Sequence, residues 1–290
     1  MPLNGLFTGP QYSLLGHQAL GVLMIRLPLA LCSVAVTIAL TQLVSAADLA
    51  PVYKSPAPIA SNWSGFYVGG SLGGRWADST WTTTAIGDPQ GPADPTTTPA
   101  SFNGSTFRIA AYLGYNWQFA PQWLVGLEAD AGWAQRTITL AGIPGTFGTG
   151  GQGVDLGATA FDSSSVKLGW DGSLRGRIGF LVAPTWLLYA TGGLAWQHVS
   201  INATCDGSFF NASWCVAVRN EAASTTRLGW TVGGGIETLF WNNWLLRAEY
   251  RYADYGSIDH GFFADASIDQ VVMTQSLRTN TGLVGLAYKF

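Results

Sequence analysis

Alternation of apolar and polar residues is the clearest signal along this chain, and the segment from Arg278 to Phe290 shows it best. Read back in twos from Phe290, one row is apolar, while the other row is small or polar apart from Leu283. Successive side chains of a β-strand point to opposite faces, so this spacing predicts a strand. The pattern recurs in seven further segments. The eight predicted strands span Trp63–Trp76, Thr106–Phe119, Trp123–Arg136, Val166–Val182, Trp186–Ile201, Thr225–Phe240, Trp244–Ile258 and Thr274–Phe290.

The connections between these strands alternate between short and long. The short ones are Ala120–Gln122, Ala183–Thr185 and Trp241–Asn243. The long ones are rich in Gly, Thr, Ser, Asp and Pro and cover about residues 77–105, 137–165, 202–224 and 259–273. Outer-membrane barrels have brief periplasmic turns and long external loops. We therefore expect an all-β protein, an eight-stranded antiparallel, up-and-down transmembrane barrel with its last strand ending in the periplasm.

A tryptophan follows each short connection, at Trp123, Trp186 and Trp244. Tryptophan favours the boundary between water and lipid. Because the three residues share one end of the predicted barrel, we expect them to form an aromatic girdle on the periplasmic side.

The polar rows of the strands carry charges of both signs, whereas the opposite rows carry residues such as Leu168, Leu174 and Ile178. An arginine or lysine that faces the bilayer midplane costs about 2–4 kcal/mol, so the charged rows are expected inside. An eight-stranded barrel has room for little more than its own side chains. We therefore expect an ion-pair network that closes the lumen, with a narrow solute pathway as the alternative. The predicted members are Arg108, Glu128, Asp130, Asp171, Arg175, Arg177, Arg227, Glu237, Arg247, Glu249 and Arg251.

Composition agrees with a membrane setting. Charged residues make up 11% of the chain, against about 25% in soluble domains, while 13 residues are tryptophan. The net charge of −3 and the lack of any Lys/Arg cluster argue against a nucleic-acid partner.

The first 46 residues are predicted to be a signal peptide, with Arg26 before an apolar run and small residues before Ala47. Residues 1–23 contain no Lys or Arg, so we expect translation to start at Met24. A Pro-rich periplasmic linker is predicted over residues 47–62 and the barrel over 63–290. Cys205 and Cys215 remain after cleavage, and export predicts a disulfide between them, with two free thiols as the alternative.

Catalysis is not expected. His198 and Ser200 resemble the His/Ser arrangement of outer-membrane lipid A deacylases, but the next acids along the chain, Asp206 and Glu221, are not placed to orient the histidine. The few histidines and cysteines do not have metal-ligand spacing, so we expect neither a metal nor a cofactor.

Several motifs resemble a known family. Asn62–Gly70 (NWSGFYVGG), Gly176–Gly179 (GRIG), Arg247–Tyr252 (RAEYRY) and the terminal Tyr288–Phe290 are similar to the small porin-like, opacity-type outer-membrane immunogenic proteins of alphaproteobacteria. The resemblance covers residues 47–290. It implies an integral outer-membrane protein that supports envelope integrity, contacts membrane lipid and lipopolysaccharide, and exposes loops to hosts or ligands.

The resemblance extends to assembly and to ligands. Tyr288 and Phe290 are similar to the terminal signal that the barrel assembly machinery reads. Some relatives are linked to haem binding, but no ligand pair in this sequence carries that property over. We therefore expect a structural and surface role. The alternatives, in order, are a small-solute porin, an adhesin or haem-binding surface protein, and a lipid-modifying enzyme.

Overall fold

The structure is a computed structural model that describes residues 62–87, 93, 95, 98–146, 162–205, 218–264 and 270–290. The predicted signal peptide, its start at Met24 and the linker as far as residue 61 lie outside the described residues and stay predictions. In the part of the chain that is described, no helix is long and apolar enough to cross a membrane.

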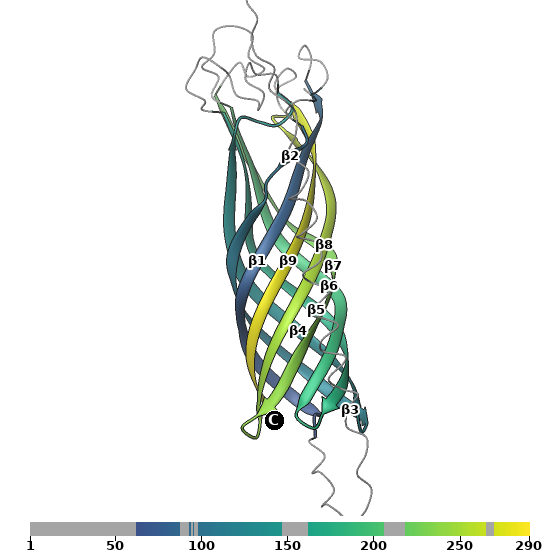
Figure 1. Ribbon diagram of the computed structural model, residues 1–290. Helices are drawn as coiled ribbons and strands as arrows, with labels where there is room; N and C mark the ends of the chain where they lie inside the picture. The colour runs from purple at the N-terminus through teal and green to yellow at the C-terminus, as the bar shows by residue number, and fades with distance from the viewer. Residues whose placement is uncertain are drawn as a thin grey trace, which may run out of the picture. The chain divides into compact units, whose positions relative to one another are not determined.

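Eight long antiparallel strands form a closed sheet. They are β1 (Gly65–Ile86), β3 (Gly104–Ala120), β4 (Trp123–Ala141), β5 (Ser163–Ala183), β6 (Trp186–Cys205), β7 (Arg219–Phe240), β8 (Trp244–Phe262) and β9 (Val271–Lys289). Neighbours pair in chain order, and β1 also pairs with β9, from Tyr67 opposite Lys289 to Ile86 opposite Val271 (Figure 1). A short ninth strand, β2 (Ala100–Ser101), adds to the side of β1. The prediction of an all-β, eight-stranded barrel is confirmed.

Tight turns join the strands in pairs at one end of the barrel, here called the turn end. The connection between β7 and β8 contains Trp241 and Asn242 with positive φ angles of 46° and 65°. Positive φ at two central turn positions matches the twist of neighbouring antiparallel strands. The C-terminus lies at the same end, because Tyr288 of β9 is opposite Trp244, the first residue of β8 (Figure 1).

Toward the other end, here called the loop end, the strands are longer than the sequence predicted. β1 continues past the predicted limit at Trp76 to Ile86, and β6 continues past Ile201 to Cys205. The predicted long connections are therefore too long at both of their ends. Ser, Thr and Gly in one row of these extensions gave them the composition of loops, although the alternation itself continues.

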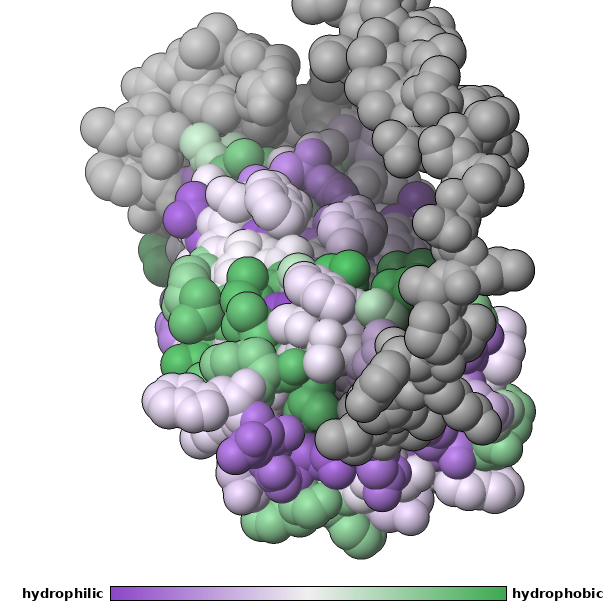
Figure 2. Space-filling view, turned by 60° about the horizontal axis from the view of Figure 1, so that its bottom comes forward, coloured by the Kyte–Doolittle hydropathy of each residue, from purple (hydrophilic) through white to green (hydrophobic). Residues whose placement is uncertain are grey.

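The outer wall of the barrel is apolar over the half next to the turn end. Leu127 of β4 is 66% exposed, and Leu174 and Ile178 of β5 are each 49% exposed. Figure 2 shows green hydrophobic side chains across the visible wall, with patches of purple hydrophilic side chains on either side of them. Contiguous exposed apolar surface of this kind is expected where lipid replaces water.

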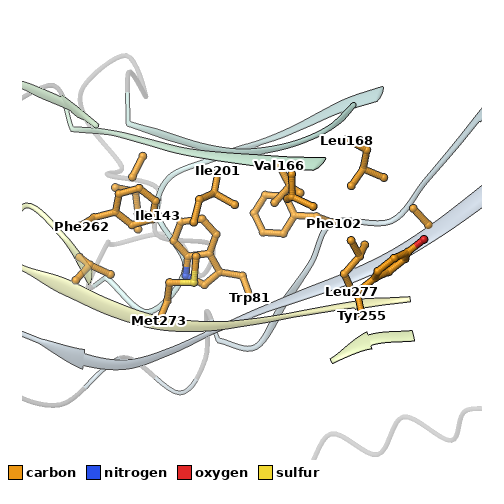
Figure 3. Close-up of a cluster of buried hydrophobic side chains, with 14 of the residues drawn as sticks. Trp81, Phe102, Ile143, Val166, Leu168, Ile201, Tyr255, Phe262, Met273 and Leu277 are labelled. Atoms are coloured by element: carbon orange, nitrogen blue, oxygen red, sulfur yellow. The ribbon is translucent and has the colours of Figure 1, made fainter. Parts of the chain in front are cut away.

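The half next to the loop end has the opposite arrangement. On β6, Val199, Ile201 and Ala203 are buried inside the barrel, whereas Ser200 and Asn202 face outward. Buried side chains from several strands point toward one another there (Figure 3). We call this group the loop-end cluster; its main members are Trp81, Phe102, Ile143, Val166, Leu168, Ile201, Tyr255, Phe262, Met273 and Leu277.

Leu168 belongs to this cluster because an irregularity in β5 exchanges the residues that face the interior with those that face outward. The ladder of β5 with β6 shifts register between Leu168 and Asp171, where two residues of β5 lie against one residue of β6. An extra residue moves the following side chains to the other face of the sheet. The prediction that Leu168 faces lipid is therefore wrong, and its side chain is buried inside the barrel.

A second apolar group fills the barrel at the turn end. Trp63 precedes β1, and its fully buried side chain donates a hydrogen bond from Nε1 to the carbonyl oxygen of Pro184 at 3.1 Å. The sequence placed Trp63 within the first strand, whereas the structure turns it into the lumen. We call this group the turn-end cluster; it consists of Trp63, Tyr67, Tyr112, Leu124, Leu181, Leu187, Tyr189, Leu245 and Ala287.

Candidate functional site: the filled lumen

Six arginines and five carboxylates of the described residues form ion pairs with one another inside the barrel, each at most 7% exposed. Along β5 they come between Leu181 of the turn-end cluster and Leu168 of the loop-end cluster. With all groups ionised, the set carries six positive and five negative charges, a net charge of +1. We call it the ionic layer. Its members are Arg75, Arg108, Arg175, Arg177, Arg247, Arg251, Glu128, Asp130, Asp171, Glu237 and Glu249.

Strand register brings several of these charges together directly. Glu128 of β4 lies opposite Arg175 of β5, and Glu237 of β7 lies opposite Arg247 of β8. Residues opposite each other on neighbouring strands share one face, so alternation along each strand is enough to align them.

Glu128 is the centre of the layer on the side of the turn end. Its carboxylate accepts hydrogen bonds from Arg175 Nη2 at 2.5 Å, Arg247 Nη1 at 2.7 Å and the Tyr67 hydroxyl at 2.8 Å. Burial of a carboxylate is costly unless its oxygens are paired. Here both oxygens are paired, and two of the three donors are cations.

Asp171 and Asp130 organise the layer on the side of the loop end. Asp171 pairs with Arg75 at 2.7 Å and with Arg108 at 2.5 Å. The Arg108 guanidinium also reaches Asp130 at 2.5 Å, and Asp130 pairs with Arg251 at 3.0 Å. These groups therefore form a continuous chain of charges rather than separate pairs.

Tyrosine rings pack against the arginines at the boundary with the turn-end cluster. The Arg247 guanidinium lies 4.1 Å from the ring centroid of Tyr112, and that of Arg177 lies 4.2 Å from the ring centroid of Tyr189. A cation over an aromatic face is stabilised by the ring's quadrupole. The rings thus join the ionic layer to the apolar side chains beneath it.

Glycines on the inner face leave space for these long side chains. A Cβ atom at Gly132 would lie 2.5 Å from Arg108 Nη2, and one at Gly285 would lie 2.9 Å from Arg247 Cγ. Several of the 37 glycines of the chain therefore serve packing inside the lumen.

The structure brings together ten of the eleven side chains predicted for the lumen network and adds Arg75. Sequence reasoning missed Arg75, although a signal was present. Arg75 lies in the predicted first strand and has the same parity as Tyr67, which also points inward.

Arg227 is the exception among the predicted members. It lies nearer the loop end, where its Nη2 donates to the backbone carbonyl oxygens of Tyr255, Gly256 and Gln275 at 3.2, 2.5 and 3.1 Å. The prediction that Arg227 belongs to the ion-pair network is corrected. It has the right parity, but among the described residues its hydrogen-bond acceptors are backbone carbonyls in place of carboxylates.

The three predicted girdle residues begin β4, β6 and β8 at the turn end. Trp123, Trp186 and Trp244 are 43%, 43% and 39% exposed. The Trp123 ring lies 5.1 Å from the Phe180 ring, and the Trp244 ring lies 5.4 Å from the Tyr288 ring. The structure thus places all three at one height on the outer wall.

The last residue of the chain lies beside the start of β1. Tyr288 and Phe290 are 39% and 70% exposed, with ring centroids 5.3 Å apart. The backbone N–H of Phe290 donates to the Phe66 carbonyl oxygen at 2.9 Å. The terminal aromatics therefore face outward on the strand that closes the barrel.

Cys205 ends β6, is buried, and takes part in a disulfide bond. Cys215 lies outside the described residues, so the pairing of Cys205 with Cys215 stays a prediction. Much of the predicted external loop surface, including residues 147–161, 206–217 and 265–269, also lies outside them. Predicted contacts of these loops with ligands or hosts stay predictions.

His198 lies on the outer wall. Its ring stacks on Trp170 with the centroids 5.6 Å apart, and its Nδ1 is 3.4 Å from Thr226 Oγ1. Ser200 instead pairs with Ser224, with 2.8 Å between their hydroxyl oxygens. Within the described ranges, no group of three or more His, Cys, Asp and Glu side chains could hold a metal ion.

A closed antiparallel barrel with an apolar belt outside and buried charges inside defines an integral β-barrel of the bacterial outer membrane. Residues 34–290 match the family model described as "Outer membrane protein beta-barrel domain". The chain belongs to this family, and the outer membrane is its location.

Relatives carry names that agree with the resemblance seen in the motifs. The chain is 27% identical to the 31 kDa outer-membrane immunogenic protein of Brucella melitensis, over 83% of this chain and 89% of the relative. It is 28% identical to the 22 kDa outer membrane protein of Rhizobium leguminosarum bv. viciae, over 82% of each chain. The predicted relationship to these proteins is confirmed.

Solved structures are more distant. Neisserial surface protein A aligns with a TM-score of 0.40 at 14% identity, over 78% of this chain and 98% of that chain. The outer membrane protease OmpT from Escherichia coli aligns with a TM-score of 0.47 at 9% identity, over 78% and 97%. Neither likeness carries a conclusion about this chain.

Proposed function

We propose that the protein is a structural component of the outer membrane with a sealed lumen, which supports envelope integrity and presents its external loops at the cell surface. One observation carries the proposal: ion pairs span the full width of the barrel. β4 and β8 are four places apart in a ring of eight long strands, yet Glu128 pairs with Arg247 at 2.7 Å and Asp130 with Arg251 at 3.0 Å. Side chains that meet from opposite walls support a lumen without an open path.

The apolar clusters support the same proposal. Trp63 and its neighbours fill the barrel below the ionic layer, and Trp81 stacks between Phe102 at 5.8 Å and Phe262 at 5.4 Å above it. An ion would have to cross two apolar layers as well as the charged one, and apolar surroundings impose a high cost on a charge.

The proposal extends to partners and to the absence of catalysis. Membrane lipid and lipopolysaccharide would contact the apolar wall, and external loops would meet ligands or host surfaces. Among the described residues, His198 contacts an indole ring and a threonine hydroxyl, and neither is an acid that could activate it as a base. We therefore propose no enzymatic role. A His198→Ala variant should leave the lipid A composition of the membrane unchanged.

Single-channel recording in planar bilayers tests the sealed lumen. We expect no steady conductance steps from the folded protein, with a general porin in the same membranes as the positive control. Regular, reproducible steps would contradict the sealed lumen and favour the porin.

The small-solute porin remains the second candidate, and one observation favours it. Several buried polar atoms of the lumen have no hydrogen-bond partner among the described residues, including Glu237 Oε1, Arg175 Nε and both amide atoms of Asn116. Buried polar groups without protein partners are commonly satisfied by water. A hydrated lumen would be a first step toward conduction.

The last strand is proposed to be read by the barrel assembly machinery. Tyr288 and Phe290 present exposed rings at the end of β9, the strand that must find β1 to close the ring. Deletion of Phe290 should lower the amount of folded protein in the outer membrane, as measured by gel mobility of unheated samples. Trp241→Gly, which removes an exposed ring but keeps the length and the positive φ of its turn, should not have the same effect, and equal assembly of both variants would contradict this role.

A further inference from the structure

The barrel wall has a seam between β7 and β8 near the loop end. The ladder between them stops at Trp230 opposite Asp254, although β7 continues to Arg219 paired with β6. β8 likewise continues to Phe262 paired with β9. Gly256, with a φ of 63°, lies in the irregularity where the ladder of β8 with β9 shifts register. This left-handed conformation favours glycine and turns β8 away from β7.

Side chains bridge the two ends of the seam. At its base, Arg227 Nη2 of β7 donates to the carbonyl oxygens of Tyr255 and Gly256 on β8. Toward the loops, Glu221 Oε2 of β7 accepts a hydrogen bond from the backbone N–H of Phe263 at 2.5 Å. Between these two contacts, the strands are not joined by their backbones.

A cavity of about 350 Å³ lies at the seam, which is within the usual size range of small-molecule sites. Its inner wall includes Ile201, a member of the loop-end cluster, so the cavity reaches the interior of the barrel. Residues from four strands contribute, chiefly Val199, Ile201, Ala223, Ile258, His260 and Gln275.

Two lining side chains carry polar atoms without partners. Gln275 is fully buried and donates from Nε2 to Ser79 Oγ at 2.9 Å, but its Oε1 has no partner among the described residues. His260 Nε2 also lacks a hydrogen-bond partner there, since its nearest carboxylate oxygen, on Glu221, is 3.9 Å away. Buried acceptors and donors are rarely left unpaired, so these atoms are available to the polar group of a ligand.

The charges around the cavity limit what that polar group can be. Asp259 lies at the lining and accepts a hydrogen bond from Thr274 at 2.6 Å, while Glu221 lies beside His260. Two carboxylates disfavour an anionic head group. A hydroxyl fits, because it can donate to the free oxygen of Gln275 and also accept a hydrogen bond.

We infer that this seam is a binding site for a small neutral amphiphile, an aliphatic molecule with one hydroxyl group, that enters from the membrane surface. The apolar body packs against Val199, Ile201 and Ile258, and the hydroxyl pairs with Gln275. The ionic layer lies below the site, so the ligand is held at the seam and is not conducted through the barrel.

Photolabelling tests this site. The full-length protein in lipid nanodiscs is incubated with a ten-carbon alcohol that carries a diazirine, irradiated, and mapped by peptide mass spectrometry. We expect labels on the cavity-lining residues of β6, β7 and β8. Excess 1-decanol should compete at least about tenfold better than decane or decanoate.

Two matched variants locate the binding. Ala223→Trp fills the cavity and should remove the labels on its lining, whereas Ala222→Trp, on the exposed face of the same strand, should retain them. Both are first checked for heat-dependent gel mobility, which reports a folded barrel. Gln275→Leu gives an independent test, because it should abolish the preference for the alcohol over the alkane while labelling persists.

Some results would overturn the inference. Labels confined to the lipid-facing wall, for example at Leu194 or Leu228, would indicate partition into lipid only. Equal labelling of the lining in the Ala222→Trp and Ala223→Trp variants would exclude the cavity as the site. An unchanged alcohol preference in Gln275→Leu would exclude the proposed hydrogen bond.

Discussion

Along β6, the side chains that face the barrel interior change from Tyr189 and Thr191 near the turn end to Val199 and Ile201 near the loop end. The outward side chains change in the opposite sense, from Leu188 and Leu194 to Ser200, Asn202 and Thr204. The half next to the turn end therefore has an apolar outer wall and holds the ionic layer inside, with the turn-end cluster beneath it. The other half is apolar inside and polar outside.

The surroundings of the wall therefore set which row of side chains is apolar, even within one continuous sheet. Where lipid lies outside, apolar side chains face out and the interior is left for charges that neutralise one another. Where water lies outside, the strands follow the rule of soluble proteins and bury their apolar row. Trp170 and Trp230 lie on the outer wall near the height where the outward side chains change from apolar to polar. We interpret this height as the outer edge of the membrane.

The ionic layer and the loop-end cluster also differ in how much stability is lost when one side chain is removed. Charges in the ionic layer are buried, so the loss of one leaves its partners uncompensated. Side chains in the loop-end cluster are stabilised by apolar contact, and after one is shortened its neighbours can move to restore part of that contact. Removal of one carboxylate from the ionic layer is therefore the strongest test of this difference.

The largest effect is expected for Glu128→Ala. It leaves Arg175, Arg247 and Tyr67 without their shared acceptor and should lower the free energy of unfolding by about 3–5 kcal/mol. Urea titration in lipid vesicles, followed by tryptophan fluorescence, measures the change. A midpoint equal to that of the unmodified protein would mean that the ionic layer does not hold the barrel together.

Two arginine substitutions on the outer wall compare its two halves directly. Leu174→Arg places a charge in the apolar belt and should destabilise the protein by about 2–4 kcal/mol. Ser200→Arg places the same charge on the polar half and should change stability by less than about 0.5 kcal/mol. The same titration measures both variants. An equal loss of unfolding free energy in the two would show that the change from apolar to polar outward side chains does not mark the membrane boundary.

A smaller effect is expected from Gly132→Ala. The added methyl group would lie 2.5 Å from Arg108 Nη2, which two carboxylates hold in place, so we expect a loss of about 1–3 kcal/mol. Gly176→Ala is the control, because its Cβ would meet only the Gly192 carbonyl oxygen at 3.9 Å. If the two variants melt alike, the inner glycines are not required for packing of the arginines.

The smallest effect is expected from Arg278→Ala, which removes an ion pair on the outside of the barrel. Arg278 donates to Asp254 at 3.1 Å, but its side chain is 62% exposed. Exposed pairs contribute about 0–1 kcal/mol. A loss as large as that of Glu128→Ala would remove the distinction between charges inside and outside the barrel.

The sequence was sufficient to predict the strands, the ring and most of the ionic layer, because all three follow from alternation. Glu128 and Arg175 could be assigned to the lumen by counting in twos. Leu168 was misplaced because counting cannot detect the irregularity between it and Asp171.

Other parts of the interior have no periodic signal at all. Phe102 and Ile143 lie outside the long strands yet are fully buried in the loop-end cluster, and Trp63 enters the barrel before its first strand begins. Arg227 had the right parity, but its partners are backbone carbonyls left by an interrupted ladder. Such contacts depend on where strand pairing stops, which only the three-dimensional structure shows.

The most direct test of the account is the height at which the wall of β6 leaves the lipid. Leu188, Leu194, Ser200 and Asn202 are replaced one at a time by cysteine, spin-labelled, and measured in vesicles for collision with oxygen and with a water-soluble nickel chelate. Collisions with oxygen should dominate at Leu188 and Leu194, and collisions with the nickel chelate should dominate at Ser200 and Asn202. Lipid-like collision rates that continue to Asn202 would contradict this prediction.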